Sequence, residues 1–408
     1  MKKLHLEPKY LILFSCCLSV LTYQGARDIM SVLLPPIQNE FSLNYTQLGV
    51  IAGAFDWGFF SSLLIGGYLA DKYGRRRMIS IGLVWLVVNS LLVTLAATYQ
   101  QVVLFRFLSA FGFATYFGAA NSLIAENFEP SERGKAIGMH YSGGAVGRLL
   151  MPLIAAFVVG TMGWREAFYV LVLAAILALI FFFFTTNRRQ EMVANKTPIS
   201  LADFREMVLK NKGLWQVMLL FSISVLTGTS VVFIPISLVR TWGTSITEAA
   251  LYLSIVPLVM IFAAPLMGTL SDRFGWKPVI MISMAANAIF LYLFPIVPPG
   301  IFLILVLVGI GIVSRIITVI LAISMDVMVP RLRSTSLGFI NTAGALALTL
   351  LPIVGGYIAD ISSFRYTFIF MAIVSLLGVG ATGIVRVHTK VERSLTEAVP
   401  QSSYRDVR

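Results

Sequence analysis

The sequence has little charge. Only 12% of its 408 residues are Asp, Glu, Lys or Arg, whereas 58% are hydrophobic. Average soluble domains contain about 25% charged residues, so this composition excludes an ordinary soluble globule. A helix needs roughly 20 apolar residues to cross a bilayer. The sequence contains about twelve runs that meet this need, which predicts an all-α integral membrane protein with about 12 transmembrane helices.

Cysteine and histidine are scarce as well, with two and three residues. Cys16 and Cys17 are adjacent in the first apolar run, where they cannot form a useful structural bridge, and no histidine lies at a ligand spacing from them. We therefore expect no metal, no cofactor and no disulfide framework. Nor does the sequence contain a nucleophile constellation, and its outward loops are too short for a catalytic domain, so we do not expect an enzyme.

The basic residues are unevenly distributed. The net charge is +12, and 24 of the 31 Lys and Arg fall in the segments that would face one side of the membrane. An excess of Lys and Arg marks cytoplasmic segments. We therefore expect both termini in the cytoplasm, in a prokaryotic cytoplasmic (inner) membrane. The positive charge then reflects topology rather than a nucleic-acid partner, and we expect a monomer in the lipid bilayer.

Residues recur at an offset near 200, which indicates an internal duplication. Pro35 corresponds to Pro235, and Pro152 to Pro352. We predict an amino-terminal six-helix bundle (1–186), a cytoplasmic linker (187–212), a carboxy-terminal six-helix bundle (213–386) and a cytoplasmic tail (387–408). The predicted spans are 10–34, 45–69, 79–97, 101–125, 135–159 and 165–186 in the first bundle, and 213–239, 247–271, 279–297, 300–327, 335–358 and 365–386 in the second.

A charged loop motif, GxxxD[KR]xG, also occurs twice, as GYLADKYG from Gly67 and GTLSDRFG from Gly268. With this motif the chain resembles the major facilitator superfamily (MFS) of secondary transporters. The resemblance implies the MFS fold, in which two pseudo-symmetric six-helix halves rock about a site near the midplane.

In the resembled family this loop latches the two halves together on the cytoplasmic side. A carboxylate at a helix end is suited to such a role, because it accepts hydrogen bonds from unpaired amides and pairs with arginine. The alternative is that the basic residues of the loop only fix topology. The latch residues implied by the resemblance are Gly67, Asp71, Gly74, Arg75, Glu126, Arg133, Asp272, Arg273, Gly275 and Arg333.

Six charged residues fall well inside the predicted spans: Arg27, Asp28, Asp56, Arg106, Arg148 and Arg315. Each would cost about 2.5 to 3.5 kcal/mol if it faced lipid. We therefore expect them to face a wet cavity or one another.

The depths of two of these residues along their spans suggest that Asp28 and Arg106 pair. An aspartate that can lose such a partner can take up a proton, so we assign proton coupling to Asp28, Arg106 and Asp56. The alternative for Asp28 and Arg106 is a permanent structural ion pair. The alternative for Asp56 is a bond to Arg148 or to a backbone group.

Arginines outnumber aspartates in the spans by four to two. An unpaired guanidinium is suited to binding a carboxylate through two parallel hydrogen bonds, so we assign Arg27, Arg148 and Arg315 to a small-molecule anionic substrate. Tyr23, Tyr116, Tyr141 and Asn341 are further candidates for substrate hydrogen bonds, although each is also compatible with ordinary helix packing.

The acidic and basic pair in the first span, with an arginine in the fourth, resembles the anion:cation symporter branch and the spinster-like carriers. Both interpretations that remain are transporters. The first is proton-coupled symport of a small organic anion, such as a carboxylate, by alternating access. The second is proton-driven export of amphipathic or cationic compounds, such as drugs or lysolipids. Neutralising Arg315 should abolish substrate binding in the first case, and neutralising an aspartate should abolish it in the second.

Overall fold

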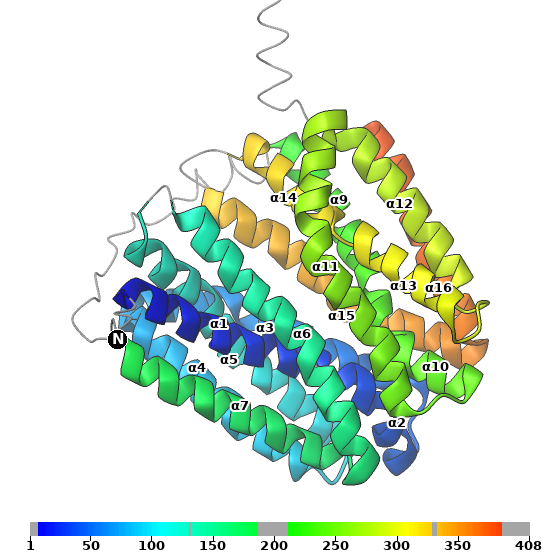
Figure 1. The fold of residues 1–408 in the computed structure, drawn as a ribbon, viewed down its shortest axis with the longest axis horizontal. Helices are drawn as coiled ribbons and strands as arrows, with labels where there is room; N and C mark the ends of the chain where they lie inside the picture. Colours follow the sequence, from blue (N-terminus) through cyan, green and yellow to red (C-terminus); the bar gives the residue numbers. More distant parts are fainter. Residues whose placement is uncertain (1–6, 130–131, 187–210, 329–332, 386–408) are drawn as a thin grey trace, which may run out of the picture.

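The protein is described by a computed structural model that covers residues 7–129, 132–186, 211–328 and 333–385 (Figure 1). Every regular element in these ranges is a helix. The first half contains α1 (Pro8–Asp28), α2 (Met30–Phe41), α3 (Tyr45–Tyr73), α4 (Arg75–Thr94), α5 (Tyr99–Asn127), α6 (Arg133–Thr161) and α7 (Trp164–Thr185). The second half contains α9 (Lys212–Gly228), the 3-10 helix η2 (Thr229–Phe233), α10 (Ile234–Trp242), α11 (Ile246–Phe274), α12 (Trp276–Leu293), α13 (Ile301–Val313), α14 (Ile316–Val327), α15 (Arg333–Ile361) and α16 (Phe364–Ile384).

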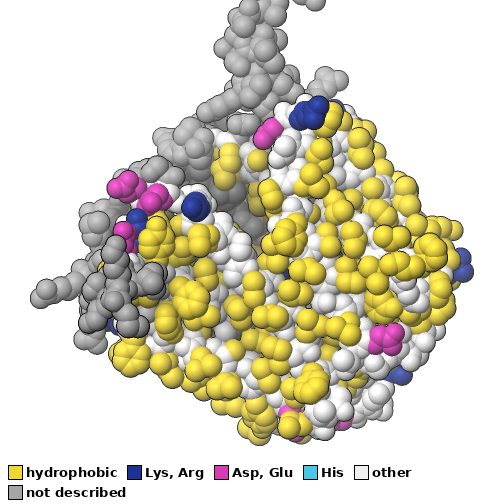
Figure 2. All heavy atoms as spheres, viewed as in Figure 1, with side chains coloured by type: hydrophobic (Ala, Val, Ile, Leu, Met, Phe, Trp, Pro, Cys, Tyr) yellow, Lys and Arg dark blue, Asp and Glu magenta, His cyan; other side chains and the backbone are white. Residues whose placement is uncertain are grey.

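The all-α membrane fold predicted from composition is confirmed. Ten helical segments are long and apolar enough to cross a bilayer, and α1 with α2, and α3, give two more long helical stretches. Hydrophobic side chains extend across the visible face of the molecule, whereas charged ones gather near its margins (Figure 2). Such an apolar surface is expected where lipid replaces water as the solvent. Most of the predicted linker, and all of the predicted tail, lie outside the described residues.

The first helical stretch of each half is interrupted at corresponding positions. The break at Ile29, between α1 and α2, lies 200 residues before the start of η2 at Thr229. In the second half Pro235 explains the irregular segment, because proline lacks an amide proton and its ring clashes with the carbonyl four residues earlier. The span that contains α13 and α14 is also broken, at Ser314 and Arg315, whereas α5 in the first half is continuous.

The repeated loop motif forms a similar turn in both halves. Gly74, between α3 and α4, has φ 93°, and Gly275, between α11 and α12, has φ 82°. These positive φ values are the reason that both positions are glycine. Arg75 forms an ion pair with Glu126, and Arg133 Nε donates to the carbonyl of Phe128 at 3.1 Å.

These motif contacts join helices of one half rather than the two halves. Asp272 is exposed, and the Arg273 guanidinium lies 5.4 Å from the ring of Phe274. The side chains of Asp71 and Arg333 lie outside the described part of the chain. A latch between the halves therefore stays a prediction for these loops.

The halves are held together at their outer ends, meaning the ends opposite the basic loops. Asp360, near the end of α15, accepts hydrogen bonds from the amides of Tyr45 (2.7 Å) and Thr46 (2.8 Å) and from the Thr46 hydroxyl (2.6 Å). The carboxylate of one half therefore caps the first turn of α3 in the other half, where the positive end of the helix dipole favours it.

The backbones of α3 and α15 also approach very closely in this region. A Cβ atom at Gly49 would collide with the carbonyl of Pro352, and one at Gly356 with the carbonyl of Tyr45. Arg240 of α10 adds hydrogen bonds to Gln38 (2.7 Å) and Asn39 (2.6 Å) of α2. The outer ends of the two halves are thus closed in this structure.

We expect Asp360→Ala to shift the protein toward a form with separated outer ends, because three hydrogen bonds to one carboxylate are lost. Hydrogen bonds to a charged group contribute roughly 1.5 to 3 kcal/mol, so the open population should rise about tenfold or more. Spin labels at the exposed positions Ser42 and Pro298, with Cys16 and Cys17 replaced, would report the distance between the outer ends. Glu248→Ala, an exposed carboxylate at the outer start of α11, is the matched control. An unchanged distance distribution in Asp360→Ala would contradict this role.

Candidate functional site

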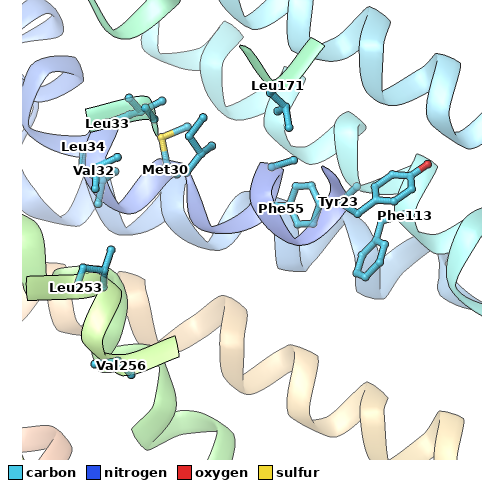
Figure 3. Close-up of a cluster of buried hydrophobic side chains, with 14 of the residues drawn as sticks. Tyr23, Met30, Val32, Leu33, Leu34, Phe55, Phe113, Leu171, Leu253 and Val256 are labelled. Atoms are coloured by element: carbon cyan, nitrogen blue, oxygen red, sulfur yellow. The ribbon is translucent and has the colours of Figure 1, made fainter. Parts of the chain in front are cut away.

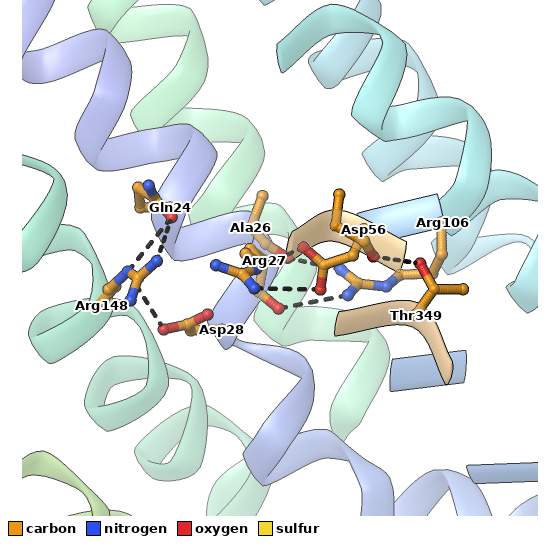
Figure 4. A network of polar contacts seen from close by, with 9 residues as sticks. Gln24, Ala26, Arg27, Asp28, Asp56, Arg106, Arg148 and Thr349 are labelled. Atoms are coloured by element: carbon orange, nitrogen blue, oxygen red, sulfur yellow. Dashed lines mark hydrogen bonds and ion pairs between the residues drawn. The ribbon is translucent and has the colours of Figure 1, made fainter. Parts of the chain in front are cut away.

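Five of the six intramembrane charges meet around the break in the first span (Figure 4). Arg27 and Asp28 form the end of α1, and Asp56, Arg106 and Arg148 reach this point from α3, α5 and α6. Four helices of the amino-terminal half thus contribute to one polar network. The expectation that these residues face one another is correct, but the pairs differ from those predicted.

Arg27 pairs with Asp56. Its Nε lies 2.9 Å from Oδ1 of Asp56, and its Nη2 donates to Oδ2 at 3.2 Å. This two-point geometry is the strong arrangement for an arginine and a carboxylate. Only 19% of the Arg27 side chain and 13% of the Asp56 side chain are exposed. Among the described residues Asp56 thus has Arg27 as its partner rather than Arg148 or a backbone group, the two alternatives for it.

Asp28 pairs with Arg148 rather than with Arg106. The distance from Arg148 Nε to Asp28 Oδ2 is 3.7 Å, so the contact is looser than that of Arg27 with Asp56. Arg148 also donates to Oε1 of Gln24, at 3.1 Å from Nη2 and 3.3 Å from Nε. The side chains of Arg148 and Asp28 are 28% and 31% exposed, which makes this the more open of the two pairs.

The prediction that Arg106 pairs with Asp28 is wrong. Arg106 is 2% exposed and donates to the backbone carbonyls of Ala26, at 2.6 Å, and Arg27, at 3.3 Å. Its guanidinium lies over the ring of Phe55, at 5.3 Å. Carbonyls at the end of a helix lack intrahelical partners, and a basic side chain can satisfy them. Arg106 thus stabilises the break in the first span, which in turn orients Arg27 and Asp28.

We expect Arg106→Leu to lower the apparent Tm of the purified protein, measured by thermal denaturation in detergent. The two carbonyls would lose their donor, at a cost of roughly 1 to 3 kcal/mol each. Arg106→Lys keeps the charge but has fewer hydrogen-bond donors, so its apparent Tm should lie between those of Arg106→Leu and the wild type. The exposed Arg365→Gln is the control for loss of an arginine. A leucine variant as stable as the wild type would show that Arg106 does not support the break.

Arg315 belongs to the other half and lies between α13 and α14, at the break in its span. The buried Nε of Arg315 has no hydrogen-bond partner among the described residues. Arg315 and Arg148 are two like charges, from different halves, and each lies near the middle of its membrane span. An anion between them would stabilise both.

The tyrosines predicted to bind substrate occupy different environments. Tyr23 and Tyr116 are fully buried, which contradicts their assignment to a substrate-facing surface in this conformation. Tyr23 packs against Phe113, with ring centroids 5.2 Å apart (Figure 3). Tyr116 donates to the carbonyl of Cys16 at 2.6 Å and contacts His140 Nε2 at 2.7 Å. The His140 contact was missed, since these residues lie on separate helices and no spacing rule links them.

Tyr141 and Asn341 remain accessible. Tyr141 is 47% exposed and lies seven residues before Arg148, on the same face of α6. Asn341 on α15 has intermediate exposure. Both stay candidates for contacts to a substrate.

A comparison with protein families decides the class of the chain. Residues 16–239 and 217–404 match the model described as "Major Facilitator Superfamily". The chain belongs to this superfamily. The resemblance inferred from the doubled loop motif is therefore confirmed, and a family of transporters agrees with the expectation that the protein is not an enzyme.

Curated relatives within the superfamily match over part of the chain. The "Probable sulfoacetate transporter SauU" of Cupriavidus necator is 31% identical over 170 residues, which cover 41% of this chain and 39% of the relative. The "Cis,cis-muconate transport protein" of Acinetobacter baylyi is 26% identical over 150 residues, or 37% of this chain and 36% of the relative. The chain thus spans about two fifths of the length of the curated relatives that it matches.

Solved structures of the superfamily match over nearly the whole chain. A bacterial homologue of the human lysosomal transporter Spinster, in an inward-facing and occupied conformation, gives a TM-score of 0.78 at 19% identity, covering 93% of this chain and 97% of the other. A D-xylose-proton symporter gives 0.78 at 18% identity, covering 93% and 99%. At these identities the similarity establishes the fold alone.

Proposed function

We propose that the protein is a secondary transporter that carries a small organic anion together with protons. The observation that supports this most directly is the position of Arg315, which lies at the break in the middle of its span with a buried Nε that has no hydrogen-bond partner among the described residues. In the other half Arg148 lies near the middle of α6 and is only loosely paired with Asp28. Two such arginines favour a negatively charged substrate. The sulfoacetate and cis,cis-muconate named for the relatives are organic acids, which agrees with this substrate class.

The mechanism rests on the contrast between the two ion pairs. In the proposal the substrate anion binds Arg148 and Arg315, and in doing so it replaces Asp28 at the guanidinium of Arg148. The loose 3.7 Å contact makes this exchange feasible. Asp28, without its counter-ion in a site of low dielectric constant, then takes up a proton. Substrate and proton cross together as the halves rock about the site.

Asp56 has a secondary role in this scheme. Its two contacts with Arg27 keep both charges satisfied in the absence of substrate, so the pair stabilises the broken first span. Export of an amphipathic or cationic compound is the alternative. It is retained as an outcome of the test.

The test is uptake into proteoliposomes that contain the purified full chain, with and without an inward proton gradient. The panel should include labelled sulfoacetate, cis,cis-muconate, succinate, acetate and a lipophilic cation. We expect gradient-stimulated uptake of one or more of the acids. Transport of the cation with no transport of any acid would replace the proposal by the exporter interpretation.

Two variants separate the roles of the aspartates. We expect Asp28→Asn to abolish the dependence of acid uptake on the proton gradient while counterflow, the exchange of substrate without a gradient, persists. Asp56→Asn should instead lower the Tm, because it removes the charge that pairs with Arg27, and any remaining uptake should still respond to the gradient. If Asp28→Asn kept full gradient dependence and Asp56→Asn lost it, the two assignments would be reversed.

A further inference from the structure

The charges inside the bundle do not cancel, and the excess is shared equally between the halves. Apart from the six intramembrane charges, every charged residue in the described helices lies within three residues of a helix end. The amino-terminal half holds Arg27, Arg106 and Arg148 against Asp28 and Asp56, which leaves one positive charge. The carboxy-terminal half holds Arg315, which also leaves one.

The hydrogen bonds of the network identify which arginine carries the excess in the amino-terminal half. Arg27 is held at two points by Asp56, and Arg106 is enclosed and donates to backbone carbonyls. Arg148 is partly exposed and only loosely paired with Asp28, so its charge becomes available when Asp28 is displaced and protonated, as in the proposed mechanism. The accessible positive charge of that half is therefore at Arg148.

The accessible charge of the other half is at Arg315. Its side chain is neither buried completely nor fully exposed, and its Nε is unpartnered within the described residues. Since α13 ends at Val313 and α14 begins at Ile316, the arginine lies where the helix is interrupted, in the middle of its span. Each half thus presents one guanidinium at a similar depth.

We infer that the substrate is a dianion whose two acidic groups bind one to each half, the first to Arg148 and the second to Arg315. This inference rests on the proposed function and specifies its substrate class. With Asp28 protonated, a dianion would offset the charges of Arg148 and Arg315 as water leaves the site, where the attraction between opposite charges is strongest. Arg106 would keep its bonds to the backbone carbonyls. A monoanion would leave one guanidinium uncompensated. Because the two acidic groups would bridge the halves, binding would also favour the closed site that must rock across the membrane.

The test compares diacids with derivatives that differ by one charge. The purified full chain would be titrated with sulfoacetate, succinate, glutarate and adipate, and with succinamate, glutaramate and adipamate, the half-amides of the dicarboxylates, at pH 7.5. The readout is the concentration that gives half-maximal thermal stabilisation, since a ligand that binds the folded state raises the Tm. We expect the preferred dicarboxylate to be at least tenfold more potent than its half-amide.

Variants of Arg315 connect this preference to the second acidic group. In Arg315→Gln the dicarboxylate should be less than threefold more potent than its half-amide, mainly because the dicarboxylate binds more weakly. Arg365→Gln, which removes an exposed arginine of the same half, should keep the full preference. Arg315→Lys retains the charge, so it should keep the preference with weaker binding overall, and it serves as the test if the glutamine variant does not fold.

The outcomes distinguish this inference from the proposed function. If half-amides or simple monocarboxylates stabilise the protein as well as the diacids, the dianion inference is overturned and an organic-anion transporter remains. A preference that survives in Arg315→Gln, or disappears in Arg315→Lys, also overturns it. If no anion binds and none is taken up by proteoliposomes, the proposed function fails together with the inference.

Discussion

The break in the first span is where the protein offsets most of the cost of charge in a bilayer, about 2.5 to 3.5 kcal/mol for each intramembrane group. Arg106 donates to the carbonyls before the break, and the end of α1 is thereby fixed so that Arg27 reaches Asp56 and Asp28 reaches Arg148. Without the hydrogen bonds from Arg106, the end of α1 that holds both Arg27 and Asp28 would lose this stabilisation. The polar network is thus as much a feature of the fold as of the site.

Composition and periodic apolar runs were sufficient to predict the helical architecture, because a lipid environment permits few alternatives to long apolar helices. The repeated loop motif was sufficient to predict the family, which a match over both halves confirms. The twelve predicted spans correspond to the helical stretches observed, although three of them are interrupted. Pro235 offered a local signal for one interruption. Pro35 lies six residues after the break at Ile29, as Pro235 lies six residues after Thr229, so that interruption carried the same signal. No proline lies near Arg315, and the sequence offered no signal for the third interruption.

The composition of the charged network was predictable, and its pairing was not. Six charges in apolar spans had to meet one another or a cavity, and five of them do meet. Depth along a helix suggested Asp28 with Arg106, but depth does not fix the rotation of one helix against another. In the structure Arg106 of α5 points to the backbone carbonyls of α1, and Arg148 of α6 points to the Asp28 carboxylate. Tyr23 and Tyr116 were predicted to face the substrate, but both are buried. An aromatic side chain inside a span can pack against other helices as readily as it can bind a substrate.

The central claim is that arginines from opposite halves hold one substrate, and a double-mutant cycle tests it most directly. Binding of the preferred acid would be measured for the wild type, Arg148→Gln, Arg315→Gln and the double variant. If one anion bridges both guanidiniums, each single change should remove much of the affinity and the second change should add little, with a coupling of roughly 1 kcal/mol or more. Strictly additive losses would mean that the two arginines do not share a ligand, and would contradict the account.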